Sequence, residues 1–132
     1  MTTIRKAGAL IINDKKLLIV KPKGKPYFIN PGGKYEAGET AENCLRRELK
    51  EELQVNVTSM KHFKTYTVDK AAHSNHPLIL ELYFVKISGK IIPSSEIAIF
   101  QWMSKADFDA RKFNTPSSFE KYIPDLIKEG AI

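Results

Sequence analysis

Short apolar runs separated by polar breaks mark the first quarter of the chain. Residues 7–13 and 16–21 are rich in isoleucine, leucine and valine and flank an Asn-Asp pair, which is a turn signal. This pattern predicts a β-hairpin. Residues 21–26 (KPKGKP) predict a loop because lysine, proline and glycine dominate them, and residues 27–30 predict a brief extended segment.

The middle of the chain predicts one helix and then several strands. Thr40 is suited to cap a helix that runs to about Leu53. Residues 55–68, 78–87 and 97–103 predict strands. A polar loop that contains His73 and His76 joins the first two of these strands.

The C-terminal part predicts two helices. Ser104 can cap a helix of about two turns, and Ser117 or Ser118 can begin the last one. Pro124 should kink or divide that last helix, because proline lacks the N–H of a helical hydrogen bond. The order strands, helix, strands, helices predicts a mixed α/β or α+β domain.

Length and composition restrict the class of protein. With 132 residues, the chain is expected to form a single domain, residues 1–132. It has no apolar run of membrane-spanning length, and Cys44 is its single cysteine. The sequence gives no sign of secretion or of an internal disulfide, so we expect a cytoplasmic location and no membrane partner.

The helix predicted after Thr40 has a core-facing apolar stripe, which consists of Ala41, Leu45, Leu49 and Leu53. At 100° per residue, Glu48, Glu51 and Glu52 share a neighbouring face. Glu52 lies partly inside the arc of the stripe. A run of charges that only met solvent would be centred on the opposite side, so these three carboxylates border the core.

Three carboxylates within one helical turn repel one another unless a cation lies among them. A Pro31-Gly32-Gly33 turn precedes the helix and can bring backbone carbonyls to that cation. Oxygen ligands without histidine favour Mg²⁺ or Mn²⁺, and Mg²⁺ usually binds substrate phosphates as well. The pattern therefore indicates a phosphate ester or anhydride as substrate. The alternative is an ordinary surface helix with Glu–Lys and Glu–Arg pairs.

Charge is unevenly distributed along the chain. Residues 33–55 hold four basic and six acidic residues, a net charge of −2. The rest of the chain has a net charge of +8, and the whole chain therefore has +6. An acidic cluster inside a basic protein suits a metal site that receives a polyanion, although a basic surface can also serve solubility alone. No basic stripe with interleaved aromatic residues is present, so nucleic acid is a less favoured partner.

The spacing within residues 33–55 carries a family resemblance. Gly33, five residues, Glu39, seven residues and then Arg47 to Val55 (RELKEELQV) match the Nudix box, G-x5-E-x7-R-E-U-x-E-E-x-G-U, where U is aliphatic. Only Gln54 departs from it, at a position that is usually glycine. The probability that the matched positions coincide by chance is on the order of 10⁻⁸ per starting point. The chain therefore resembles a Nudix hydrolase, and the order of its elements is compatible with that family over nearly the whole length.

The resemblance implies an α/β/α sandwich around a mixed sheet, in which the box forms a loop–helix–loop. It also implies Mg²⁺-dependent hydrolysis of a nucleoside diphosphate linked to another moiety. By position, Glu48, Glu51 and Glu52 would be metal ligands, joined by the carbonyl of Gly32. Glu48 would orient or deprotonate the attacking water, and Arg47 would hold the carboxylates.

Two further box positions affect the loop and the end of the helix. Glu39 and Gly38 would shape the loop. Gln54 replaces the glycine that usually supplies a left-handed cap. Glutamine can enter that conformation at modest cost, and every metal-binding position is intact, so we expect activity to survive.

Several residues outside the helix are candidate substrate contacts: Lys21, Lys23, Phe28, Asn30, Lys34, Glu81 and Glu96. The two loop lysines can reach phosphates or remain solvated. Phe28 can stack on a base or pack in the core, whereas Asn30 can read a base edge. Glu81 can point into a cleft or lie on an exposed sheet face. Glu96 is either a further ligand or base, or a loop carboxylate without a role.

The sequence motifs that mark Nudix hydrolases of ADP-ribose, dinucleoside polyphosphates, NADH and coenzyme A are missing. By elimination, the chain is similar to mutator-type enzymes that convert a nucleoside triphosphate, normal or oxidised, to the monophosphate and pyrophosphate. The alternatives are a Nudix-like module that binds a nucleotide without hydrolysis, and a hydrolase of RNA 5′ ends, nucleotide sugars or another substrate.

Overall fold

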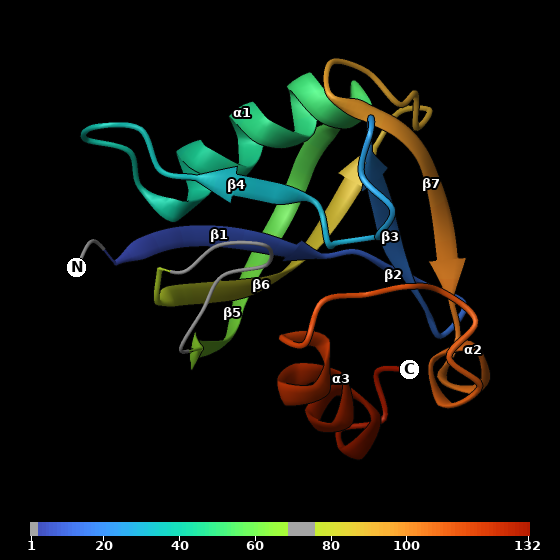
Figure 1. Ribbon diagram of the computed structural model, residues 1–132. Helices are drawn as coiled ribbons and strands as arrows, with labels where there is room; N and C mark the ends of the chain where they lie inside the picture. The colour runs from blue at the N-terminus through green and yellow to red at the C-terminus, as the bar shows by residue number, and fades with distance from the viewer. Residues whose placement is uncertain (1–2, 69–75) are drawn as a thin grey trace.

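A computed structural model describes residues 3–68 and 76–132 of the chain (Figure 1). His73 of the predicted polar loop lies outside the described residues. The helices and strands are β1 (Ile4–Leu10), β2 (Ile12–Asn13), β3 (Lys16–Pro22), β4 (Gly32–Lys34), α1 (Ala41–Leu53), β5 (Asn56–Val68), β6 (Leu78–Ser88), β7 (Ile97–Met103), α2 (Lys105–Asp109) and α3 (Phe119–Lys128).

The strands form two sheets rather than one. The four-stranded sheet has the order β4-β1-β6-β5, and β1 and β6 are parallel within it while the other pairs are antiparallel. The second sheet, β2-β3-β7, is antiparallel. The mixed α+β class is therefore confirmed, and the mixed pairing comes from the parallel β1–β6 pair.

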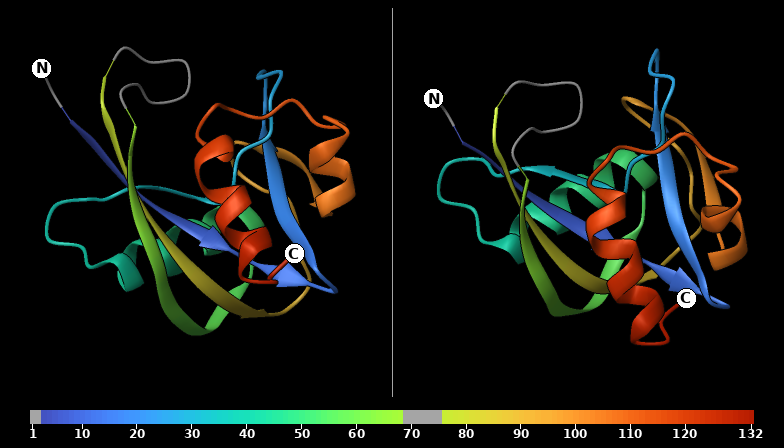
Figure 2. Two further views of the ribbon diagram at one scale, coloured as in Figure 1. Left: turned by 90° about the horizontal axis from the view of Figure 1, so that it is seen from below. Right: turned by 60° about the horizontal axis from the view of Figure 1, so that its bottom comes forward.

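Helices cover both faces of the four-stranded sheet. In Figure 1, α1 lies above β4 and β1, whereas α3 lies below them, and Figure 2 shows α3 from that lower side. Two apolar cores fill the spaces between the sheet and the helices. One includes Leu45 and Leu49 and lies between the sheet and α1, and the other includes Tyr122 and Ile123 and lies between the sheet and α3. This arrangement is the α/β/α sandwich that the family resemblance implies.

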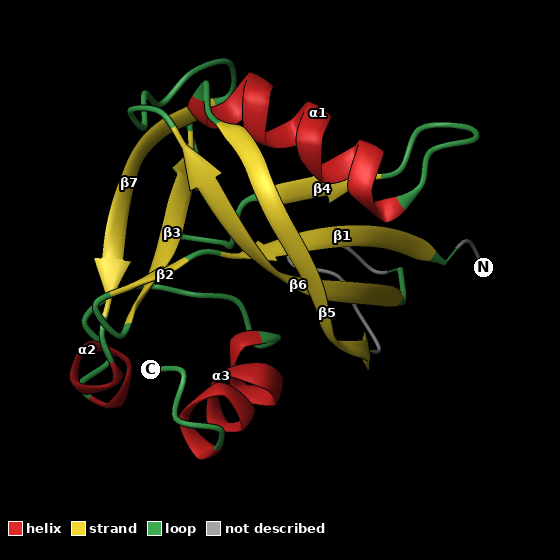
Figure 3. Ribbon diagram, turned by 180° about the vertical axis from the view of Figure 1, so that it is seen from behind, coloured by secondary structure: helices red, strands yellow, loops and turns green. Residues whose placement is uncertain are grey.

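The predicted N-terminal hairpin is present, but its first strand is divided. Ile11 separates β1 from β2, so β1 joins the four-stranded sheet and β2 pairs with β3. Asp14 and Lys15 form the connecting turn with positive φ of 52° and 58°. The division allows one apolar run to serve both sheets, and Figure 3 shows how the chain passes from one to the other.

Helix α1 begins and ends where the sequence predicts. The Thr40 hydroxyl accepts a hydrogen bond from the backbone N–H of Asn43 at 3.1 Å. Gln54 adopts the left-handed conformation, φ 57° and ψ 35°, and its N–H donates to the carbonyl of Lys50. The Gln54 side chain also donates to the Ser94 hydroxyl at 2.6 Å, which ties the end of α1 to the segment before β7.

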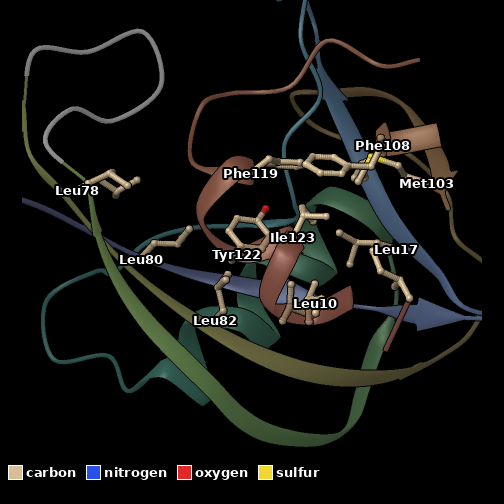
Figure 4. Close-up of a cluster of buried hydrophobic side chains, with 14 residues drawn as sticks. Leu10, Leu17, Leu78, Leu80, Leu82, Met103, Phe108, Phe119, Tyr122 and Ile123 are labelled. Atoms are coloured by element: carbon tan, nitrogen blue, oxygen red, sulfur yellow. The ribbon is translucent and has the colours of Figure 1, made fainter. Parts of the chain in front are cut away.

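The C-terminal helices differ from the predictions in two respects. Helix α2 is shorter than two turns, although Ser104 caps it through a reciprocal capping box with Asp107. Of the two outcomes expected at Pro124, a kink or a division, the division is wrong, because α3 continues from Phe119 to Lys128. Burial of the apolar face of α3, which includes Tyr122 (Figure 4), offsets the missing hydrogen bond.

None of the helices in the described part of the chain has the length and apolarity that a membrane span requires.

Pro124→Ala should stabilise the protein. Pro124 is exposed and interrupts the hydrogen bonding of α3, so alanine restores an N–H for the carbonyl of Glu120 without altering the core. We expect the free energy of unfolding in urea to rise by about 1 kcal/mol or more. An unchanged or lower value would show that Pro124 is not a source of strain in α3.

Candidate active site

Gly32 and Gly33 do not form the turn that the sequence predicts, because both lie in β4 and pair with β1. Gly32 has a φ of 133°, and a Cβ there would lie 2.1 Å from the carbonyl oxygen of Ala7. A Cβ on Gly33 would lie 2.7 Å from the carboxylate of Glu48. Gly32 therefore allows β4 to pass close to β1, and Gly33 leaves the space that the Glu48 carboxylate occupies.

Three carboxylates converge beside these glycines of β4. Oxygens of Glu48, Glu52 and Glu96 all lie within 4.8 Å of one another. Glu52 is 3% exposed and accepts a hydrogen bond from the Gly32 N–H at 3.2 Å. Burial raises the pKa of Glu52 well above its ordinary value, and the charges of Glu48 and Glu96 raise it further, against the opposing effect of the Gly32 N–H.

Arg47 holds the acidic helix to the loop before it. Its guanidinium donates to Glu39 at 2.7 and 2.8 Å and to Glu48 at 2.5 Å. The hydrogen bonds from Arg47 and from the Glu36 N–H lower the pKa of Glu39 to about 2. Arg47 also lies 3.8 Å from Glu51, the i,i+4 pair that the sequence indicates.

A wide cavity, which we define by its lining residues Lys6, Lys34, Glu48, Glu52 and Glu96, opens over the carboxylates. Its volume is about 420 Å³. The two lysines come from neighbouring strands, since Lys6 of β1 pairs in register with Lys34 of β4. The cavity thus places cationic side chains opposite anionic ones, as a site for a metal-bound phosphate chain requires.

A narrow cavity adjoins the wide one and shares Lys6, Gly32 and Gly33 with it. We define it by Asn30, Gly8 and Leu80, which line it with those shared residues. Its volume is about 60 Å³. Because the two cavities share these lining residues, they lie next to each other along β1 and β4.

The structure separates the sequence-predicted candidates into two groups. Glu48, Glu52, Glu96, Lys34 and Asn30 line the two cavities. Glu51 lies outside the carboxylate cluster, with 54% of its side chain exposed, but it is close enough to Arg47 to pair with it.

The remaining candidates do not line either cavity. Glu81 forms an ion pair with Arg5 at 2.6 Å. Phe28 packs edge-to-face on Phe113, with ring centroids 5.3 Å apart, so it belongs to the core under α3. Lys21 and Lys23 are not among the residues that line either cavity.

Lys6 and Tyr122 are site residues that the sequence analysis missed. Lys6 lines both cavities, and burial lowers its pKa. Tyr122 donates a hydrogen bond to the Asn30 side chain at 3.0 Å. Strand periodicity places Lys6 on the same side of β1 as Gly8 and Leu10, but both sides of β1 are buried from Ala7 onwards, so the pattern did not single it out. Nothing in the sequence connects Tyr122 to Asn30, which is 92 positions away.

The carboxylate cluster fits a hard divalent cation. All three donors are carboxylates, and histidine and cysteine side chains do not join them among the described residues. Three acidic groups this close, one of them buried, are costly without a compensating charge. The arrangement can thus hold a metal ion against a phosphate chain in the wide cavity.

Comparisons with known proteins agree with this chemistry. A family model described as the NUDIX domain matches residues 2–126. The chain is 30% identical over 128 residues to the 8-oxo-dGTP diphosphatase of Buchnera aphidicola subsp. Schizaphis graminum. This match covers 90% of this chain and 89% of that protein. It is 33% identical over 93 residues to the NAD-capped RNA hydrolase NudC of Pseudomonas aeruginosa, covering 69% of this chain and 32% of that protein.

A solved structure shares the fold. It comes from a study of MutT from Aliivibrio salmonicida and Vibrio cholerae, and it superposes with a TM-score of 0.76 at 24% identity. The match covers 97% of this chain and 99% of that chain.

Glu52→Gln should stabilise the metal-free protein and remove its response to metal. Glutamine keeps an acceptor for the Gly32 N–H but removes a carboxyl group whose ionisation is opposed by burial and by Glu48 and Glu96. In the presence of a chelator, we expect the free energy of unfolding of the variant to exceed that of the wild type by about 1–3 kcal/mol. Mg²⁺ should raise the melting temperature of the variant less than that of the wild type. The matched control is Glu51→Gln, for which we expect a change within about 0.5 kcal/mol. A destabilised Glu52→Gln protein would contradict this account.

Gly33→Ala should weaken metal binding without removing a ligand. The added methyl group would meet the Glu48 carboxylate, which must shift, while the backbone can accommodate alanine. We expect Mn²⁺ affinity, measured by titration calorimetry, to fall about tenfold or more. Circular dichroism monitors the fold, and unchanged affinity in a folded variant would show that the position of Glu48 does not matter for the metal.

Proposed function

Because this chain belongs to the Nudix family of pyrophosphohydrolases, we propose that it hydrolyses a nucleoside triphosphate, normal or oxidised, to the monophosphate and pyrophosphate. The single observation that carries the proposal is the Glu48–Glu52–Glu96 cluster at the base of the wide cavity. The similarity to an 8-oxo-dGTP diphosphatase along most of both chains supports this substrate class.

Glu48, Glu52 and Glu96 would hold Mg²⁺ in this proposal. When bound, the ion neutralises phosphate charge and lowers the pKa of a bound water. The carboxylates are prepared for this role, because Arg47 holds Glu48 and the Gly32 N–H holds Glu52. Glu51 would contribute by holding Arg47 in place.

Lysine side chains would bind the phosphate chain of the substrate. Lys34 lines the wide cavity from β4, and Lys6 lies beside it at the junction with the narrow cavity. Their ammonium groups favour the negative charge that develops on the departing pyrophosphate. This places the phosphates in the wide cavity and the nucleoside towards the narrow one.

A carboxylate of the cluster would take the proton of the attacking water. Glu48 is ion-paired to Arg47, and Glu52 is buried. Glu96 is exposed and forms no ion pair with a side chain in the described ranges, so it is the freest of the three to accept a proton. The water oxygen bonds to phosphorus as the bond to the pyrophosphate oxygen breaks.

A nucleotide-capped RNA 5′ end is a second candidate substrate. The similarity to NudC covers 69% of this chain, and the positive balance outside residues 33–55 suits a longer polyanion. This chain corresponds to only 32% of that protein, so the nucleoside triphosphate is the better-supported proposal.

Neutral variants of the cluster should abolish turnover. We expect Glu48→Gln and Glu96→Gln to lower kcat for release of pyrophosphate from a nucleoside triphosphate panel by about 10²-fold or more. The matched control is Glu42→Gln, because Glu42 is on the same helix but exposed and paired with Arg46.

The control should retain activity within about threefold of the wild type. Wild-type rates in folded Glu48→Gln and Glu96→Gln variants would refute the assignment of this cluster. Turnover of capped RNA without turnover of any free nucleotide would favour the second candidate.

A further inference from the structure

Gln54 stands where the Nudix box has glycine, and its side chain contacts the segment that carries Glu96. The backbone of Gln54 has a φ of 57° and a ψ of 35°, a left-handed conformation that glycine adopts more easily than a residue with a Cβ. Glycine would therefore end α1 at least as well. Any contribution that the Gln54 side chain makes comes from its contacts rather than from the cap.

The Gln54 amide binds Ser94 in one defined direction. Its Nε2 donates to the Ser94 hydroxyl at 2.6 Å, and that hydroxyl donates in turn to the carbonyl of Ile92 at 3.0 Å. Because the proton of the Ser94 hydroxyl is used by Ile92, its oxygen is left to accept, and only the amino end of the Gln54 amide can donate to it. The two bonds thus hold the Ser94 side chain between α1 and its own loop.

The backbone of the same loop is also bound to the end of α1. The N–H of Ile92 donates to the carbonyl of Leu53 at 2.9 Å, and the N–H of Ser94 donates to the carbonyl of Glu52 at 2.8 Å. These carbonyls belong to the last turn of α1, where no helical N–H follows to bind them. Figure 1 shows the chain between β6 and β7 passing this end of the helix. The Gln54 side chain adds a third bond to this junction.

Glu96 follows in a turn that begins at Ser94. The N–H of Ile97 donates to the carbonyl of Ser94 at 3.0 Å, so Ser95 and Glu96 are the two central residues of a β-turn. Ile97 is buried, and the N–H of Lys23 donates to the carbonyl of Glu96 at 2.7 Å. With the far side of the turn held in this way, the position of Ser94 determines where the Glu96 carboxylate lies.

Glu96 needs this support because the other two carboxylates repel it. Its oxygens lie within 4.8 Å of those of Glu48 and Glu52. Arg47 holds Glu48, and the Gly32 N–H holds Glu52. Glu96 is exposed and has no ion pair within residues 3–68 and 76–132, so the restraint on it acts through its backbone.

We propose that Gln54 is a positioning residue for Glu96: through Ser94 it holds the turn against α1, so that the Glu96 carboxylate joins those on the helix. This inference rests on the proposed function in taking the carboxylate cluster as the metal site. Gln54 lies two positions after Glu52, and Ser94 lies two positions before Glu96. The Gln54–Ser94 bond therefore joins the two segments of the cluster close to their ligands.

Binding of Mn²⁺ alone to Gln54→Gly tests the inference, because this change keeps the left-handed cap and removes the bond to Ser94. We expect the metal-free variant to melt at the wild-type temperature or up to about 4 °C higher. Its Mn²⁺ affinity, measured by electron paramagnetic resonance of the free ion, should fall about three- to tenfold, as loss of one hydrogen bond predicts. If Gln54 only capped the helix, the affinity would not change.

Ser94→Ala supplies the same test without altering the backbone at residue 54. It should weaken Mn²⁺ binding by a factor similar to that of Gln54→Gly, and the double variant should bind no more weakly than either single variant. Asn56→Ala is the matched control, because the Asn56 amide is also exposed near the end of α1 but accepts from Lys50 instead of binding the loop. It should keep the wild-type affinity.

A Glu96→Gln background shows whether the effect passes through Glu96. In that background, Gln54→Gly should weaken Mn²⁺ binding by less than about twofold, because the carboxylate that it positions is already lost. A general loosening of the fold would instead weaken binding by the same factor in both backgrounds.

Wild-type Mn²⁺ affinity in folded Gln54→Gly and Ser94→Ala, or an equal loss in the Glu96→Gln background, would overturn the inference and leave the proposed function intact. Absence of Mn²⁺ binding by the wild type would overturn both. Hydrolysis of nucleoside triphosphates is measured separately. If Mn²⁺ binding follows the expected pattern but no triphosphate is cleaved, the proposed activity fails while the role of Gln54 stands.

Discussion

The close approach of three carboxylates at the base of the wide cavity is the constraint on which the rest of the site depends. Glu52 is buried beside Glu48 and Glu96, so their mutual repulsion destabilises the folded chain unless a cation compensates it. The surrounding residues maintain this costly arrangement. Gly33 leaves room for Glu48, Gly32 donates its N–H to Glu52, and Arg47 connects the helix to the loop before it.

The same glycines of β4 also border the space where a substrate can lie. Together with Lys6 of β1, they line both the wide cavity and the narrow one. The phosphates of a nucleotide would contact the charged groups of the wide cavity, and its nucleoside would lie towards the narrow cavity, which has few polar side chains. In the proposed function, the catalytic groups would come from adjacent parts of β1, β4 and α1, while Tyr122 of α3 donates a hydrogen bond to Asn30 from the opposite face of the sheet.

Local patterns in the sequence accounted for most of the elements and part of the site. The caps at Thr40 and Ser104, the left-handed Gln54 and the burial of Glu52 follow from neighbouring residues, so they could be predicted. Glu96 could be named as a candidate, but only the fold brings it to Glu48. The division of the first strand at Ile11 and the Tyr122–Asn30 contact depend on which sheets and helices meet, which no local pattern specifies.

Anomalous X-ray scattering from crystals grown with Mn²⁺ and a non-hydrolysable nucleoside triphosphate analogue tests the central claim most directly. The account predicts a manganese peak at bonding distance, about 2.2 Å, from oxygens of Glu48, Glu52 and Glu96, with analogue phosphate oxygens completing the coordination. A fully occupied analogue with no manganese peak at these carboxylates, or with the ion held elsewhere on the chain, would contradict it.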